Sequence, residues 1–193
     1  MQEIQRRLRE SAELKLRLGP AELEPLQALI EATVGALRAG HKVLFFGNGG
    51  SAADSQHLAA ELVGRYQRER RGWPAIALTT DTSILTSVGN DYGYDHVFER
   101  QIEALAQPGD IAIGISTSGN SPNVKLGLER ARSIGGIVTA AFLGRDGGAI
   151  RPLVDHAIVI MHAETSRIQE CHITLGHIFC ERVESLMLDG PAR

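Results

Sequence analysis

The sequence predicts an α/β fold, a three-layer sandwich with a five-stranded parallel sheet that two N-terminal helices precede. From residue 42 onward, short apolar runs alternate with helical patterns. The run 111–115 is apolar throughout, as a parallel strand must be when helices cover both faces of its sheet. Glycine-rich and polar loops follow several of these runs, where strand-to-helix connections bind ligands in open parallel sheets.

Two amphipathic helices are expected in the first 40 residues. Residues 2–18 place Leu8 and Leu14 among charged side chains, and this pattern stops at Gly19. Residues 21–39 carry a second apolar stripe that ends at Gly40. We expect residues 1–40 to pack on the sheet domain or at an interface between subunits.

Five strands are expected over residues 42–46, 75–79, 110–115, 137–142 and 156–161, with helical segments between them. The chain has 193 residues, of which 43% are apolar, enough for one substantial core but too few for two ordinary domains. The sequence therefore predicts a single domain over residues 1–193.

The composition argues against several classes of partner. The net charge is -3 and basic residues are scattered among acidic ones, so we expect no nucleic-acid ligand. The apolar runs are strand-sized, and Glu3, Glu10 and Glu13 interrupt the N-terminus, which therefore does not resemble a targeting segment, so we expect no membrane partner. Two cysteines, Cys171 and Cys180, are too few for a disulfide scaffold. We expect a cytoplasmic protein.

A glycine-rich turn follows the first apolar run and leads into a helical pattern. Its residues are Asn48, Gly49, Gly50 and Ser51. Glycines let a ligand approach the backbone closely, and the amides of a first helical turn lack partners and carry partial positive charge. We expect this turn to hold phosphate or sugar oxygens.

A second polar loop follows the third strand and contains Ser116, Thr117, Ser118 and Ser121. Its hydroxyls and the start of the next helix form a neutral phosphate cradle on one interpretation. On the other, it is a capped turn whose hydroxyls bond only their own backbone.

The pair Asn90 and Asp91 lies in a third polar break, Gly89–Gly93. Such residues are typical of a turn that ends a helix. They also donate and accept the hydrogen bonds that sugar hydroxyls need.

Histidine and carboxylate residues at helical spacing indicate a metal site. A single histidine on a helix is usually packed or solvated, so the case depends on pairing. His57 and Glu61 lie four residues apart, and His177 completes a set of two imidazoles and one carboxylate if the last helix packs beside the first loop. Gln169 is a neutral fourth ligand of this zinc set.

The spacing of Gln169 and His177 restricts how that set assembles. Eight residues span about 12 Å of straight helix, too far for both side chains to reach one ion without strain. Either the first turn of the last helix is distorted, or a neighbouring subunit completes the site. The second solution predicts an oligomer with interfacial sites.

Together these residues resemble the phosphoheptose isomerases of the sugar isomerase (SIS) fold family, which interconvert sedoheptulose 7-phosphate and D-glycero-D-manno-heptose 7-phosphate. The resemblance rests on Gly47-Asn48-Gly49-Gly50-Ser51, Gln56-His57, Glu61, Gly64-Arg65-Tyr66, Gly89-Asn90-Asp91, residues 114–121, Asp146-Gly147-Gly148 and Arg167-Ile168-Gln169-Glu170 with His177.

The resemblance implies a cytoplasmic homotetramer that catalyses the first step of activated heptose biosynthesis. It implies one zinc ion per subunit, held by His57, Glu61, Gln169 and His177. It implies substrate contacts from Asn48, Gly49, Gly50, Ser51, Glu61, Asn90, Asp91, Ser116, Thr117, Ser118, Ser121 and Gln169. Arg65 matches a family arginine near the substrate, or is a surface charge. Some members have an aspartate where this chain has Ser166.

An aldose-ketose isomerisation moves a proton between C1 and C2 through an enediolate, and we expect Glu61 and His177 to form the catalytic acid/base pair. A carboxylate bound to zinc is a weaker base, so either Glu61 leaves the metal or His177 is the base. The alternative is a non-enzymatic paralogue that binds the replication initiator protein. The resemblance implies that those proteins lack residues matching Glu61 and His177. A sugar-phosphate sensing domain is a third interpretation.

Overall fold

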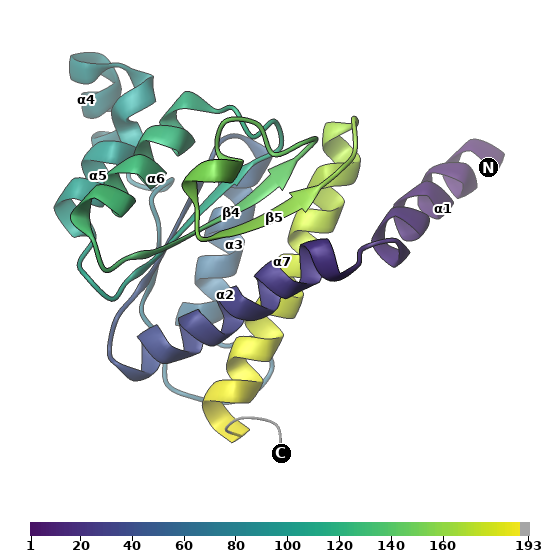
Figure 1. The fold of residues 1–193 in the computed structure, drawn as a ribbon, viewed down its shortest axis with the longest axis horizontal. Coiled ribbons are helices and arrows are strands. Elements are labelled where there is room, and N and C mark those ends of the chain that lie inside the picture. Colours follow the sequence, from purple (N-terminus) through teal and green to yellow (C-terminus); the bar gives the residue numbers. More distant parts are fainter. Residues whose placement is uncertain (190–193) are drawn as a thin grey trace.

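The computed structural model describes residues 1–189, whose elements are shown in Figure 1. The helices are α1 (Gln2–Leu16), α2 (Pro20–Arg38), α3 (Gly50–Val63), α4 (Thr82–Tyr92), α5 (Val97–Leu105), α6 (Pro122–Ile134) and α7 (Thr165–Asp189), with short 3₁₀ turns η1 (Tyr94–His96) and η2 (Arg151–Leu153). The strands are β1 (Val43–Gly47), β2 (Ala75–Ala77), β3 (Ile111–Ser116), β4 (Val138–Gly144) and β5 (His156–Ile160).

All five strands are parallel, in the order β2-β1-β3-β4-β5. The predicted five-stranded parallel sheet is therefore confirmed. Strand β2 is shorter than predicted because the chain turns at Leu78 and Thr79 toward the start of α4. The order reverses between β1 and β3, so the crevice outside their carboxyl ends is the expected ligand-binding position.

Two apolar layers lie on opposite faces of the sheet, which confirms the three-layer sandwich. Successive strand residues point to opposite faces, so Phe45 packs with α2, α3 and α7 while Phe46 packs with α5 and α6. Figure 1 shows α2, α3 and α7 gathered on one side of the strands and α5 and α6 on the other. Helices α3 and α7 therefore share one layer.

Helix α1 projects from the rest of the molecule (Figure 1). Its only buried residue is Leu14, and the apolar side chains of Ile4, Leu8 and Leu16 are exposed. One hydrogen bond links α1 to the first turn of α7: Arg167 Nη1 donates to the carbonyl of Arg7 at 2.9 Å. Within residues 1–189, no helix combines the length and apolar character needed to cross a bilayer.

Candidate active site

The loops after β1 and β3 are joined by a pair of amide side chains. Asn48 Nδ2 donates to Asn123 Oδ1 at 2.8 Å, and Asn123 Nδ2 donates to Asn48 Oδ1 at 2.9 Å. Asn123 is buried at the start of α6. Sequence analysis missed Asn123, since an asparagine near a helix start is ordinary and only the fold places it opposite Asn48. This pair links the two loops across the crevice between β1 and β3.

The glycine loop brings Gln169 to the start of α3. Gly49 has φ +57°, a conformation that favours glycine. A Cβ on Gly50 would collide with the amide Nε2 of Gln169. Two predicted site elements, the glycine loop and the start of α7, are therefore in direct contact.

The serine loop is built from hydroxyl groups that face one another. Ser116 Oγ lies 2.8 Å from Ser121 Oγ and 3.4 Å from Ser118 Oγ. Ser121 precedes α6, yet its side chain makes no capping hydrogen bond. Ser118 Oγ does accept from the Asn120 amide at 3.1 Å. The capped-turn interpretation thus fits Ser118 but not the Ser116–Ser121 pair, whose hydroxyls converge as a phosphate cradle requires.

The Asp146-Gly147-Gly148 motif, after β4, packs against the serine loop at Gly119 and Asn120. Gly119 has φ +68°, and a Cβ there would collide with the carbonyl oxygen of Gly147. The Ala149 amide donates to Asn120 Oδ1 at 2.9 Å, and the Ile150 amide donates to the Gly119 carbonyl at 3.0 Å. The glycines of both loops are needed for this close packing.

Asn90 and Asp91 occupy the last turn of α4, where they are exposed and hydrogen-bonded to each other at 2.7 Å. Gly93, with φ +89°, ends the helix, as the turn interpretation predicts. Just beyond it, Tyr94 Oη donates to Asn48 Oδ1 at 3.5 Å. The end of α4 therefore lies near the glycine loop.

Three of the four predicted metal ligands meet between α3 and α7. His57 Nε2 lies 2.7 Å from His177 Nε2 and 3.3 Å from Glu61 Oε1. One donor atom from each of these residues lies within 4.8 Å of the others. His57 is 47% exposed and Glu61 is 21% exposed at the side chain, so the cluster is accessible from solvent.

Close packing of the two helices brings these side chains together. A Cβ on Gly176 would lie 2.8 Å from Leu58 Cδ2, so glycine allows α7 to approach α3. The contacts of Gln169 with Gly50 and of His177 with His57 show that the helices run in the same direction.

Gln169 consequently lies about two helical turns from the cluster. Helix α7 is regular from Thr165, so the distorted first turn that was one expected solution is absent. The other solution, completion of the site by a neighbouring subunit, stays a prediction.

Two further residues border the cluster. The ring of Tyr66 lies 6.1 Å from the ring of His177, centroid to centroid. Asp54 lies one turn before His57 on α3, and its buried Oδ2 has no hydrogen-bond partner. Burial raises the pKa of Asp54, and the charges of His57 and His177 only partly oppose that rise. The three-residue spacing of Asp54 and His57 on one helix could have identified Asp54 from the sequence. The position of Tyr66 beside His177 is visible only in the fold.

Arg65 is exposed on the loop after α3. Its Nε lies 3.6 Å from Glu69 Oε2, and its Nη1 donates to the Gln67 carbonyl at 3.3 Å. Within one subunit its guanidinium therefore pairs along its own loop, and a substrate contact stays a prediction. Ser166 is exposed in the first turn of α7.

The donor set fits a catalytic zinc ion. Two imidazoles and one carboxylate are a common catalytic set, which leaves a coordination position for substrate or water. The Nε2 atoms of His57 and His177 face each other. When neither Nε2 carries a proton, the lone pairs of both atoms can bind one cation.

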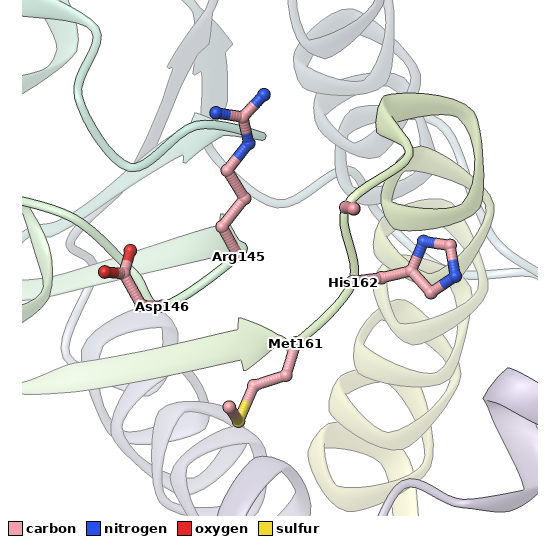
Figure 2. A pocket seen from close by; sticks show the side chains of 5 residues that line it. Arg145, Asp146, Met161 and His162 are labelled. Carbon is pink, nitrogen blue, oxygen red and sulfur yellow. The ribbon is translucent and has the colours of Figure 1, made fainter.

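A separate cavity of about 500 Å³ opens beyond the ends of β4 and β5 (Figure 2). Arg145, Asp146, Met161, His162 and Ala163 line it. None of these is a predicted site residue. This cavity and the predicted site residues therefore lie in different places.

Comparison with known proteins places the chain in a family. Residues 8–142 match the family model described as SIS domain. A phosphoheptose isomerase of Aquifex aeolicus is 53% identical over 189 residues, which cover 98% of each protein. The chain also matches the structures of two phosphoheptose isomerases, from Neisseria gonorrhoeae (42% identity, TM-score 0.87, 95% and 98% of the two chains) and Francisella tularensis (32%, 0.88, 95% and 97%).

Proposed function

The chain belongs to the SIS-domain family and, within it, to the phosphoheptose isomerases, and from that membership we propose that it converts sedoheptulose 7-phosphate to D-glycero-D-manno-heptose 7-phosphate with the help of zinc. It is a heptose phosphate isomerase, as the resemblance implied. The single observation that carries the proposed chemistry is the convergence of His57, Glu61 and His177 between α3 and α7.

The two loops at the β1/β3 crevice hold the substrate in this proposal. The hydroxyls of Ser116 and Ser121, with Thr117 and Ser118, bind the phosphate. Asn48 and the glycine loop bind sugar oxygens, and the buried Asn123 keeps the Asn48 amide in one orientation. Asn90 and Asp91 contact the sugar hydroxyls from the end of α4.

His57, Glu61 and His177 would hold the zinc ion, with Gln169 of a neighbouring subunit as fourth ligand. When bound, zinc supplies Lewis-acid polarisation of the oxygens on C1 and C2. Glu61 and His177 are the acid/base pair that moves the proton between these carbons through an enediolate. Metal binding weakens a ligand as a base, and this holds for the His177 imidazole as well as for the Glu61 carboxylate, so the member of the pair that takes the proton would do so when it is not bound to the ion.

The proposed assembly is a homotetramer with interfacial active sites in the cytoplasm. The exposed apolar side chains of α1 support it, since Ile4, Leu8 and Leu16 have no cover within one subunit. The two-turn separation of Gln169 from His177 supports it as well. In the cell, the proposed reaction is the first step of activated heptose biosynthesis.

The test is NMR of the purified protein with sedoheptulose 7-phosphate in deuterated buffer, with and without a strong chelator. Aldose signals that carry deuterium at C2, vanish on chelation and return with zinc are expected. Turnover that persists after the metal is demonstrably removed would keep the isomerase and contradict the role of zinc.

The initiator-binding alternative is not favoured. The acid/base residues that such a paralogue is expected to lack, Glu61 and His177, are present here and lie in one cluster. Two relatives that cover 98% and 95% of the chain are named phosphoheptose isomerases.

A further inference from the structure

A buried carboxylate on α7 holds the loop that leaves α3. Glu184 is 2% exposed and lies seven residues beyond His177 on the same helix. It accepts hydrogen bonds from the backbone amides of Tyr66, Gln67 and Arg68 at 3.1, 3.0 and 2.9 Å. Three successive amides thus converge on one side chain of a different helix.

The partner of Glu184 is Arg70, whose guanidinium is equally buried. Arg70 Nε donates to Glu184 Oε1 at 2.9 Å, and both side chains are 3% exposed. The rest of the guanidinium donates to the carbonyls of Glu61 at 2.8 Å and Leu62 at 2.9 Å. The carbonyls of a last helical turn have no partner inside the helix, so Arg70 caps α3 at the residue that supplies the candidate carboxylate.

The two charged groups therefore connect the helices that carry the site. Helix α3 contributes His57 and Glu61, helix α7 contributes His177, and Arg70 with Glu184 joins the last turn of α3 to α7. The same loop places the ring of Tyr66 beside His177. Glu184 lies about two helical turns beyond His177 on α7. Next to His177, Gly176 packs tightly against Leu58 of α3.

We propose that Arg70 and Glu184 are positioning residues for the isomerase site, which set the separation of α3 from α7 and hence of Glu61 and His57 from His177. This inference rests on the proposed function. A metal site tolerates little error in the placement of its ligands, and groups that orient ligands without touching the metal typically change metal affinity or activity by 10–100-fold when replaced.

Stability alone is a weak reason for such a pair. Burying two charges costs desolvation free energy that their attraction only partly offsets, and apolar residues of similar size often do as well. Glu184 and Arg70 are distinguished by what they connect, since every partner of Glu184 other than Arg70 itself is a backbone amide of the loop after α3.

The matched control is a second buried carboxylate, immediately before β3. Asp110 precedes β3, is 1% exposed and pairs with Lys42 at 2.6 Å. It also accepts from the backbone amides of Lys42 at 3.0 Å and Gln107 at 2.8 Å. Asp110→Asn therefore disturbs a similar ion pair whose hydrogen-bond partners, Lys42 and Gln107, lie outside α3, α7 and the loop after α3.

The experiment compares Glu184→Gln, Arg70→Lys and Asp110→Asn with the unchanged full-length protein. Zinc affinity is measured by competition with a chromophoric chelator, kcat and KM with sedoheptulose 7-phosphate, and unfolding in urea. Acrylamide quenching of Trp73, the single tryptophan of the chain, reports the connection directly, because Arg70 Cζ lies 3.6 Å from its ring centroid.

For Glu184→Gln and Arg70→Lys we expect zinc affinity and kcat to fall about 10–100-fold, with a more accessible Trp73 and a smaller change in KM. Asp110→Asn should lose stability to a similar degree while zinc affinity, kcat and Trp73 quenching stay unchanged. If Glu184→Gln does not fold, Arg70→Lys, which keeps the positive charge, makes the same comparison.

Variants at Glu184 and Arg70 that bind zinc and turn over like Asp110→Asn would overturn the positioning role and leave the proposed function standing. Unchanged protein that neither binds zinc nor converts the substrate would instead overturn the proposed function, and the positioning role with it.

Discussion

The Nε2 atoms of His57 on α3 and His177 on α7 lie 2.7 Å apart, although 120 residues separate them in the chain. At this distance one ring must donate its proton to the other, or both must offer lone pairs to a shared cation. Two protonated rings would repel each other at this distance. The geometry therefore fits either a neutral hydrogen-bonded pair of rings or a metal ion shared by them.

Replacing His57 by Gln should weaken zinc binding by more than about 100-fold, because one of three clustered ligands is lost rather than an outer contact. Competition with a chelator measures the change. His96→Gln, on the exposed turn η1, is the control and should bind zinc normally. Equal affinity in the two variants would remove His57 from the metal set.

Replacing Glu61 by Gln should abolish exchange of substrate protons with solvent, since the amide neither accepts a proton nor binds zinc as a carboxylate does. Mass spectrometry of the sugar phosphate recovered from deuterated buffer measures the exchange. Glu31→Gln, on α2, is a control outside the site. Deuterium incorporation that continues in Glu61→Gln would leave His177 as the sole member of the acid/base pair.

Replacing Gly50 by Ala should lower activity at least about 10-fold without loss of stability. The new Cβ would displace Gln169, a flexible side chain, and Gly50 does not have a positive φ that alanine would strain. Gly35→Ala, inside α2 with no atom within 4 Å of its Cβ, should gain about 1 kcal/mol of stability and keep full activity. Steady-state kinetics and urea unfolding of both variants give the comparison, and full activity of Gly50→Ala would show that the position of Gln169 is unimportant.

Replacing Gly119 by Ala should raise KM and destabilise the fold. The left-handed backbone at residue 119 costs alanine about 1 kcal/mol. The collision of the new Cβ with the Gly147 carbonyl adds to this cost and displaces the serine loop from the Gly147-Gly148 turn. Gly40→Ala has a similar positive φ but open space, so it isolates the backbone cost. A KM for Gly119→Ala equal to that for Gly40→Ala would contradict a phosphate-binding role of the loop.

Stability should decline in acid because of His172. Burial lowers the pKa of His172 to about 4, although donation to the Leu143 carbonyl opposes part of this shift. Between about pH 6.5 and pH 4 the unfolded chain binds a proton that the folded protein does not. The free energy of unfolding therefore decreases by roughly 3 kcal/mol as the pH is lowered through that window.

Urea unfolding at pH 7, 5.5 and 4.5, with a chelator present, measures this decline. His172→Phe removes the titrating group from a site that already packs against Phe142, so its unfolding free energy should fall less steeply over the same range. An identical pH dependence in the two proteins would assign the acid sensitivity to other groups.

Much of the fold followed from local pattern. Continuous apolar strands, helices with polar faces and glycine turns between them are set by short-range sequence, so the order of elements and the layers were predictable. Boundaries moved by one or two residues because strand ends depend on the pairing partner: β2 stops at Ala77, where the chain turns away from β1. The outward projection of α1 had no local signal, since its stripe is amphipathic whether or not a partner covers it.

The sequence by itself determined which chemical groups the protein carries: the glycine and serine loops, the His57–Glu61 spacing and a distant His177. Only the tertiary structure decided that His177 meets His57, that Asn123 faces Asn48, and that Arg70 and Glu184 join α3 to α7. Spacing along one helix is set by local geometry, whereas contacts between residues 75 to 120 positions apart depend on how the helices pack on the sheet.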